Sequence, residues 1–172
     1  MKRAPRVAAV QDISGFGRCS MTVALPVLSA MGAQCCPLPT AYLSAHTAFP
    51  ELGKAAFLDL TRELEQTQEH WAALGVALDA VYSGFIGSAG QIAAIRRFYE
   101  RFRGADTVVL CDPVMGDGGR PYRTYTPDMC RAMGELAALA DVITPNLTEA
   151  ALLLGEEYAD APGSETAARA WL

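Results

Sequence analysis

One short apolar run, followed by a loop of acids and glycines, constrains this chain most. Residues 107–111 are long enough for a strand and too short for a helix. Pro113 biases Asp112 away from helical backbone, so the strand is predicted to end at Asp112. Asp117 then lies among the glycines of residues 116–119. Two acids beside a flexible loop suggest a metal–phosphate site, whereas an ordinary solvated turn uses the same residue types.

The composition narrows the classes of protein that the chain can represent. The chain has 172 residues, is 51% hydrophobic and carries a net charge of −5, which suits a single domain with one core. The negative charge argues against nucleic acid as a partner, and no apolar run reaches the ~20 residues of a membrane helix. Five cysteines without a C-x-x-C motif indicate reduced thiols in a cytoplasmic protein.

The predicted elements alternate between strands and helices. Strands buried on both faces are expected at residues 7–10, 80–82, 107–111 and 142–144. A weaker strand at 34–38 contains Pro37 and Pro39, which favour the edge of a sheet. A helix is expected from Arg18 to Met31. Three further helices are indicated by apolar stripes at Leu60, Leu64, Trp71 and Leu74; at Ile92, Ile95, Tyr99 and Phe102; and at Met129, Met133, Leu136 and Ala140.

This alternation predicts an α/β fold with three layers, α/β/α, around a mainly parallel sheet. In such a sheet, ligands bind beyond the carboxyl ends of the strands. Glycines, hydroxyls and carboxylates collect in the segments that follow the predicted strands, at residues 11–17, 83–88, 112–119 and 144–149. The opposite edge has only single aspartates, which are typical of solvated turns. The sequence therefore predicts a ligand site at the carboxyl edge.

Three motifs allow both a structural and a functional interpretation. Residues 15–20 imitate a dinucleotide-binding turn but lack its third glycine, and residues 33–40 lack the acid that would hold a ribose, so we expect a turn that exposes backbone to a ligand. Asn146 and Glu149 have the spacing of a helix capping box, yet Glu149 beside Asp112 would also hold Mg²⁺ through water. Residues 40–50 form either a flap over a small aromatic ligand or an ordinary edge hairpin, in which His46 is structural.

Taken together, these segments resemble the pyridoxal kinases of the ribokinase-like superfamily, which salvage vitamin B6. The matching segments occur in family order at residues 10–12, 44–47, 83–88, 111–117 and 144–149. The segments at 112–115 and 144–149 suit hydroxymethylpyrimidine kinases equally well. The segments at 44–47 and 83–88 favour the pyridoxal branch.

The resemblance implies ATP-dependent phosphorylation of the 5′-hydroxymethyl group of pyridoxal, pyridoxine or pyridoxamine by a homodimer. It implies that Asp112, Thr144 and Glu149 contact ATP and its Mg²⁺, with the metal at Asp112 and Glu149. Asn146 and Asp117 would lie close to the nucleotide.

The resemblance also implies a place for the vitamin ring. Asp12 and Thr47 match contacts to the pyridine ring, and Phe85 matches an aromatic residue that packs on it. Better-known members carry a serine where this chain has Asp12. A carboxylate there would pair with a protonated pyridine nitrogen or repel a neutral one.

One family motif does not occur in these residues. Family members carry a Gly-Thr-Gly-Asp motif, whose amides form an anion hole and whose Asp is the catalytic base. The chain ends at Leu172 inside a helical pattern with Ser164 as its predicted N-cap. We therefore expect residues 1–172 to be one ribokinase-like domain truncated at its C-terminus, with the base beyond Leu172 and no kinase activity alone. A non-catalytic B6-binding module is the alternative from another class.

Overall fold

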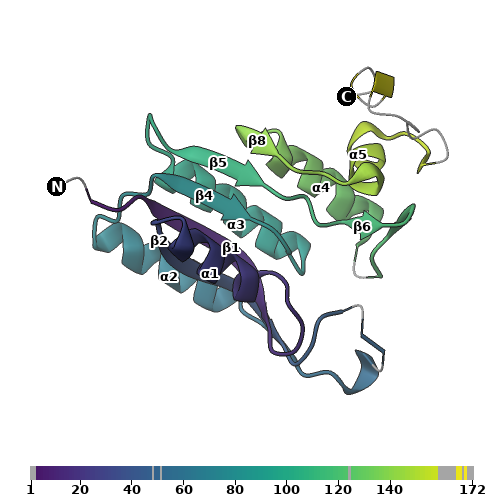
Figure 1. Ribbon diagram of the computed structural model, residues 1–172, viewed down its shortest axis with the longest axis horizontal. Helices are drawn as coiled ribbons and strands as arrows, with labels where there is room; N and C mark the ends of the chain where they lie inside the picture. The colour runs from purple at the N-terminus through teal and green to yellow at the C-terminus, as the bar shows by residue number, and fades with distance from the viewer. Residues whose placement is uncertain are drawn as a thin grey trace.

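The computed structural model describes residues 3–47, 49–50, 52–123, 125–158, 166–167 and 169, which form an α/β fold around one six-stranded sheet (Figure 1). The strand order is β3-β2-β1-β4-β5-β8, and every pairing is parallel except that of β2 with β3. The strands are β1 (Arg6–Ser14), β2 (Gln34–Leu43), β3 (Phe57–Asp59), β4 (Ala80–Ser83), β5 (Val108–Cys111) and β8 (Val142–Ile143). A separate small hairpin is formed by β6 (Gly116–Asp117) and β7 (Arg120–Pro121).

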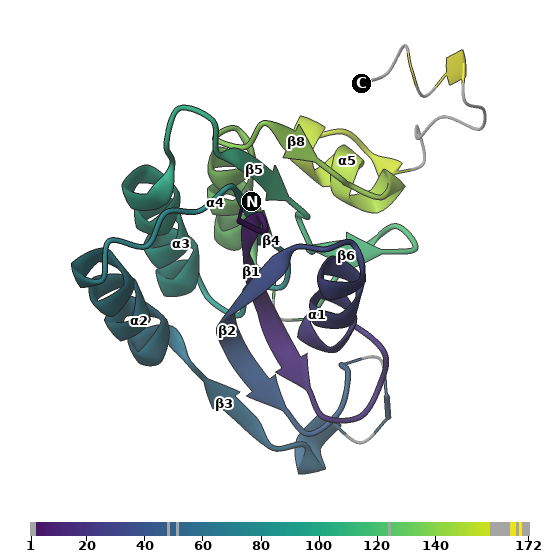
Figure 2. The same ribbon diagram turned by 60° about the vertical axis from the view of Figure 1, so that its left-hand side comes forward.

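Helices lie on both faces of the sheet (Figure 2). The helices are α1 (Met21–Ala30), α2 (Thr61–Ala73), α3 (Ala89–Phe102), α4 (Pro127–Ala137) and α5 (Leu147–Leu154). The main core lies between the sheet and α2, α3 and α4 and includes Phe98, Tyr99 and Met133, whereas a smaller cluster joins α1 to β1. The prediction of a mainly parallel sheet between helices is confirmed.

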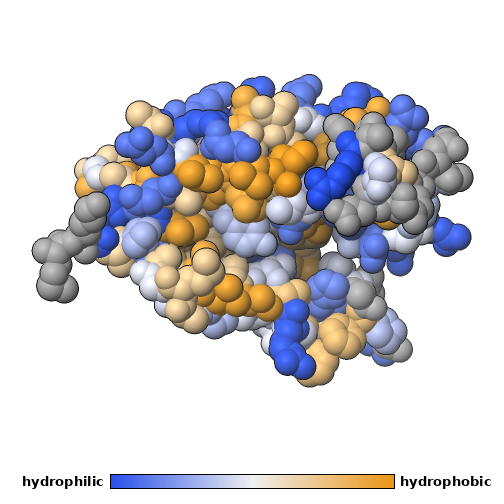
Figure 3. All heavy atoms as spheres, turned by 45° about the horizontal axis from the view of Figure 1, so that its top comes forward, coloured by the Kyte–Doolittle hydropathy of each residue, from blue (hydrophilic) through white to orange (hydrophobic). Residues whose placement is uncertain are grey.

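The prediction that the last two strands are buried on both faces is wrong. Val108 at the start of β5 is 49% exposed, and both residues of β8, Val142 and Ile143, are 44% and 43% exposed. Their exposure follows from the helix coverage, because α1 packs mainly over β1 and β2. Figure 3 shows hydrophobic side chains gathered on the surface of the molecule.

Strand β2 is longer than predicted and lies inside the sheet. Pro37 and Pro39 pair with β1 at Ala9 and Gln11, while β3 pairs with β2 only at residues 41–43. The prolines therefore stand where β2 has a strand on one side only, so a missing N–H costs no ladder bond. The expectation of an edge strand holds at the prolines and fails beyond them.

The apolar stripes predict the helices well, with errors at the ends. All four residues of the α3 stripe are buried. Leu74 follows α2 and is 64% exposed, and Ala140 follows the end of α4. Helix α1 begins at Met21 rather than Arg18, since Ser20 has a φ of 49° that no α-helix contains.

Gly134 in the interior of α4 offers a simple test of the packing. We expect Gly134→Ala to raise the free energy of unfolding by about 0.5–1 kcal/mol, because alanine restricts the unfolded chain and favours helix. The added methyl group would meet only Leu153 Cδ2, at 3.8 Å, which is an ordinary contact. Urea unfolding of both proteins measures the change, and a loss of stability would show that α4 and α5 pack more tightly than described.

Two further sequence predictions concern the last helix of the chain and the possibility of a membrane-spanning helix. The helix predicted to begin at Ser164 falls almost wholly outside the described residues, of which 166–167 and 169 are helical. None of the helices that the structure describes combines the length and apolar character needed to cross a bilayer.

Candidate functional site

A cavity of about 320 Å³ opens at the carboxyl edge of the sheet. Residues far apart in the chain line it, namely Asp12, Ser14, Ser20, Leu43, His46, Thr47, Phe85, Val114, Asp117, Arg120, Pro121, Tyr122 and Arg123. The three predicted ring contacts, Asp12, Thr47 and Phe85, are all among them. Its size and its mixture of apolar walls with a few polar groups are typical of a small-molecule site.

Asp12 is placed by the last residues of β1. Its side chain belongs to a residue only 4% exposed, and the Ser14 hydroxyl donates to Asp12 Oδ2 at 2.8 Å. The pairing of β1 with β2 is irregular between Gln11 and Ile13. A β-bulge of this kind re-aims side chains, and both Asp12 and Ser14 reach the cavity.

Phe85 lies in the turn between β4 and α3, which buried polar groups hold in place. The Thr40 hydroxyl donates to the Phe85 carbonyl at 2.9 Å, and Gln91 Nε2 donates to the Thr40 carbonyl at 2.7 Å. Gln91 Oε1 accepts from the Gly87 amide at 2.9 Å. Thr40 and Gln91 are fully buried, so the turn is fixed against β2 rather than free to move.

Thr47 lies on the connection between β2 and β3, beside the turn after β1. The Gly15 amide donates to the Leu43 carbonyl at 2.8 Å, and the His46 amide donates to the Phe16 carbonyl at 2.9 Å. Gly17, at a φ of 118°, lies so close that a side chain there would meet His46 Cβ at 3.1 Å. The sequence predicts that the turn at residues 15–20 exposes its backbone to a ligand. In the structure, the backbone of this turn faces the connection between β2 and β3. The connection is both a hairpin and a wall of the cavity.

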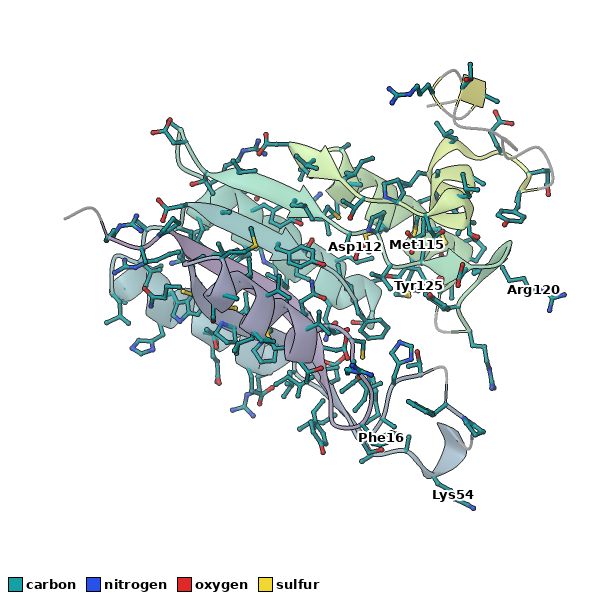
Figure 4. All side chains as sticks on the ribbon, in the orientation of Figure 1. Phe16, Lys54, Asp112, Met115, Arg120 and Tyr125 are labelled. Atoms are coloured by element: carbon teal, nitrogen blue, oxygen red, sulfur yellow. The ribbon has the colours of Figure 1, made fainter. Side chains whose placement is uncertain are left out.

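Two carboxylates, Asp112 and Glu149, lie near each other beyond the ends of β5 and β8. Burial raises the pKa of Asp112, and a hydrogen bond with the Thr144 side chain lowers it. Burial also raises the pKa of Glu149, backbone hydrogen bonds lower it, and the charge of Asp112 raises it further. Figure 4 shows where Asp112 lies relative to the sheet. Asp112, Thr144 and Glu149 thus meet at one place, as predicted.

Glu149 also has the structural role that its spacing indicates. Glu149 Oε2 accepts from the Asn146 amide at 2.8 Å while Asn146 Oδ1 accepts from the Glu149 amide at 2.9 Å, which completes a capping box. Its other oxygen, Oε1, accepts from the Met115 amide at 3.3 Å. Asn146 Nδ2 donates to the Gly116 carbonyl at 2.9 Å. These bonds join α5 to the loop that carries Asp117.

Tyr122 links the cavity to the acids, and the sequence patterns did not single it out. It lines the cavity. Burial raises its pKa, and the charges of Glu149, Asp117 and Asp112 raise it further. All three carboxylates are therefore within electrostatic reach of one cavity residue. The short hairpin β6–β7 carries Asp117 and leads into Tyr122, while Arg120 on the same hairpin points away from the sheet (Figure 4).

The acids fit a hydrated magnesium ion better than a closed metal cage. No cluster of three or more His, Cys, Asp or Glu side chains suited to a metal occurs among the described residues. Mg²⁺ usually binds one or two carboxylates and completes its shell with water and substrate phosphates. Asp112 and Glu149 supply that number of carboxylates, and Glu149 already accepts backbone N–H groups with both oxygens, so water between Glu149 and the ion suits the geometry.

Comparison with known proteins identifies similar chains. The family model described as phosphomethylpyrimidine kinase matches residues 25–172. Pyridoxal kinase PdxY of Pseudomonas fluorescens Pf0-1 is 32% identical over 153 residues, which are 87% of this chain and 52% of that protein. The chain therefore spans about half the length of the curated relatives that it matches.

Solved structures give the same result at higher identity. A crystal structure of a candidate phosphomethylpyrimidine kinase from Bacteroides thetaiotaomicron, in a form with pyridoxal, has a TM-score of 0.92 and 45% identity. It is matched over 98% of this chain and 58% of that one. The pyridoxal kinase of Lactobacillus plantarum has a TM-score of 0.85 and 36% identity, with 98% and 60% covered.

Proposed function

The chain belongs to the phosphomethylpyrimidine kinase family, and from this membership we propose that it is the substrate-binding and Mg-ATP-binding part of a pyridoxal kinase. The reaction transfers the terminal phosphoryl group of ATP to the 5′-hydroxymethyl group of pyridoxal, pyridoxine or pyridoxamine. One observation carries the proposal: a cavity of suitable size for one small ring is lined by Tyr122, and the paired carboxylates Asp112 and Glu149, which do not line the cavity themselves, act electrostatically on that residue. The similarity to a structure determined with pyridoxal supports the choice of substrate.

Each group has a definite task in this proposal. Phe85 packs on the ring, Thr47 and Asp12 contact its polar edge, and Asp117 and Tyr122 lie toward the phosphates. Asp112 and Glu149 hold Mg²⁺, Thr144 orients Asp112 and Asn146 fixes Glu149. When bound, Mg²⁺ neutralises charge on the phosphates of ATP. The chain then contributes mainly by positioning the hydroxymethyl group and stabilising charge, as phosphoryl transfer requires.

A substrate panel tests the reaction. The longest natural protein that contains this chain is incubated with Mg-ATP and each of pyridoxal, pyridoxine, pyridoxamine and hydroxymethylpyrimidine, and phosphorylated products are separated by chromatography. We expect the highest kcat/KM for a B6 vitamer. Preference for hydroxymethylpyrimidine would favour the second candidate, a hydroxymethylpyrimidine kinase, which the name of the family model supports. No product from any of them would overturn the kinase assignment.

The 172-residue polypeptide itself gives a separate prediction. It contains no Gly-Thr-Gly-Asp motif, so we expect it to bind a B6 vitamer without turnover. Titration of the vitamer followed by its absorbance measures binding, and the same sample with Mg-ATP measures turnover. Formation of pyridoxal phosphate by the pure polypeptide would contradict this expectation. Binding without turnover in the longest natural protein would instead favour a non-catalytic B6-binding module.

We also infer a cytoplasmic setting and a homodimer. All five cysteines are free, and Cys111 is buried, which fits a reducing compartment. The dimer rests on the resemblance to pyridoxal kinases. Sedimentation of the purified protein measures its oligomeric state.

A further inference from the structure

A buried polar cluster joins α3 to the carboxyl ends of β4 and β5. The Tyr99 hydroxyl shares a hydrogen bond of 2.5 Å with Ser83 Oγ, and the Cys111 thiol is hydrogen-bonded to both of these groups. Ser83 and Cys111 are 0% exposed, and Tyr99 is 1% exposed. Burial raises the pKa of Tyr99 and that of Cys111, so both groups keep their protons and the cluster carries no charge. A buried network of paired, neutral groups fixes geometry rather than binding a ligand.

The cluster lies where the two strands lead into the candidate site. Ser83 and Cys111 are partners in the register of β4 with β5. Phe85 comes two residues after Ser83, and Asp112 comes directly after Cys111. The Asp112 amide also donates to the Ser83 carbonyl at 2.8 Å. Tyr99 therefore holds, from a third element, the two strand ends that carry the cavity residue Phe85 and the acid Asp112.

We propose that Tyr99 is a positioning residue that fixes the turn at Phe85 relative to Asp112. The inference rests on the proposed function, in which Phe85 packs on the vitamer ring and Asp112 holds Mg²⁺. Phosphoryl transfer depends on how the two substrates are placed, and a misplacement of about 1 Å can cost about 100-fold in rate. Other groups hold each side by itself, since Thr40 bonds to the Phe85 carbonyl and Thr144 bonds to Asp112. The Tyr99 hydroxyl therefore sets the relation between the two sides rather than the affinity of either.

Tyr99→Phe tests this role, because it removes one oxygen and keeps the ring in the core. In the longest natural protein that contains this chain, we expect kcat to fall about tenfold. The Kd of pyridoxine and the Kd of Mg-ATP, each measured alone by titration calorimetry, should stay within about twofold of wild type. Tyr125→Phe is the matched control in the same core cluster. The Tyr125 hydroxyl is buried without a hydrogen-bond partner among the described residues, so its removal should leave kcat and both affinities unchanged.

A double-mutant cycle in kcat with Ser83→Ala shows whether Tyr99 acts through Ser83. We expect the double variant to lose no more than the larger of the two single losses. Thermal unfolding checks the fold, and if Tyr99→Phe does not fold, Ser83→Ala alone must show the same loss of kcat at unchanged affinities. An unchanged kcat, single losses that multiply, or affinities that fall as much as kcat would overturn the role of Tyr99 and leave the kinase assignment standing. Failure of wild type to phosphorylate any B6 vitamer would overturn the proposed function, and this inference with it.

Discussion

Replacing Asp112 by asparagine is expected to lower kcat/KM for phosphorylation of the vitamer about 10- to 100-fold in the longest natural protein containing this chain. The amide is a weaker ligand for Mg²⁺ and carries no charge to balance the ion. Its oxygen can still interact with the Thr144 side chain, which bonds to Asp112. The loss should therefore be catalytic rather than structural. Initial rates at increasing Mg²⁺ concentration measure it, and we expect the variant to require more Mg²⁺.

Stability provides the independent readout for the same variant. Because burial raises the pKa of Asp112 in the folded state, the folded protein holds its proton to higher pH than the unfolded chain. Stability without metal should then fall as the pH rises through the ordinary carboxyl range, and Asp112→Asn should lose part of that dependence. Mg-ATP should raise the Tm of wild type more than that of the variant. Unchanged rates and an unchanged response to Mg²⁺ would remove Asp112 from the metal site.

Glu149 provides an instructive contrast, because its carboxylate serves the fold as well. Oε1 and Oε2 accept from the Met115 and Asn146 amides, and glutamine has only one oxygen for these two donors. Glu149→Gln should therefore lose activity and also about 1–3 kcal/mol of unfolding free energy. Urea unfolding distinguishes it from Asp112→Asn. A variant as stable as wild type would mean that the capping box contributes little.

The location of the site was predictable because parallel strands end at a common edge. Asp12 lies near the end of β1, and Phe85, Asp112 and Glu149 each follow a strand. Local apolar patterns reveal these strands, and pairing brings their ends together. No long-range information was needed to place them on one rim. The ring contacts assigned through the resemblance also line a single cavity, although their roles remain proposals.

The elements that the sequence did not reveal lack a local signal. Strand β3 has three residues, all exposed, and strands β6 and β7 have two residues each, so neither period nor burial marks them. The position of Tyr122 near three carboxylates depends on the β6–β7 hairpin that precedes it, and so on tertiary structure. The exposure of Val108 depends on which strands α1 covers, which is a tertiary property. The glycines of this loop do predict one of its features, which is the positive φ of Gly118 and Gly119.

The second large effect that we expect is a loss of stability on replacing Gly116, the first residue of the β6–β7 hairpin. A methyl group there would lie 2.5 Å from the Arg120 carbonyl oxygen and 2.9 Å from Pro121 Cα, both in the backbone of β7. Backbone cannot move aside as a flexible side chain does. We expect Gly116→Ala to lower the free energy of unfolding by about 1–3 kcal/mol, as overpacking does. Urea unfolding measures this loss, and Gly53→Ala, with no atom within 4 Å of the new methyl group, is the matched control.

The same substitution should weaken vitamer binding, since the hairpin is part of the cavity wall. Asp117 and Tyr122 line the cavity, and the Gly116 carbonyl accepts from Asn146 Nδ2 in the capping box. Displacing β6 from β7 therefore disturbs the wall and the support of Glu149 together. Titration with pyridoxine below the unfolding temperature of the variant separates a misplaced wall from global unfolding. Full affinity in a destabilised but folded Gly116→Ala protein would mean that the position of the β6–β7 hairpin does not affect vitamer binding.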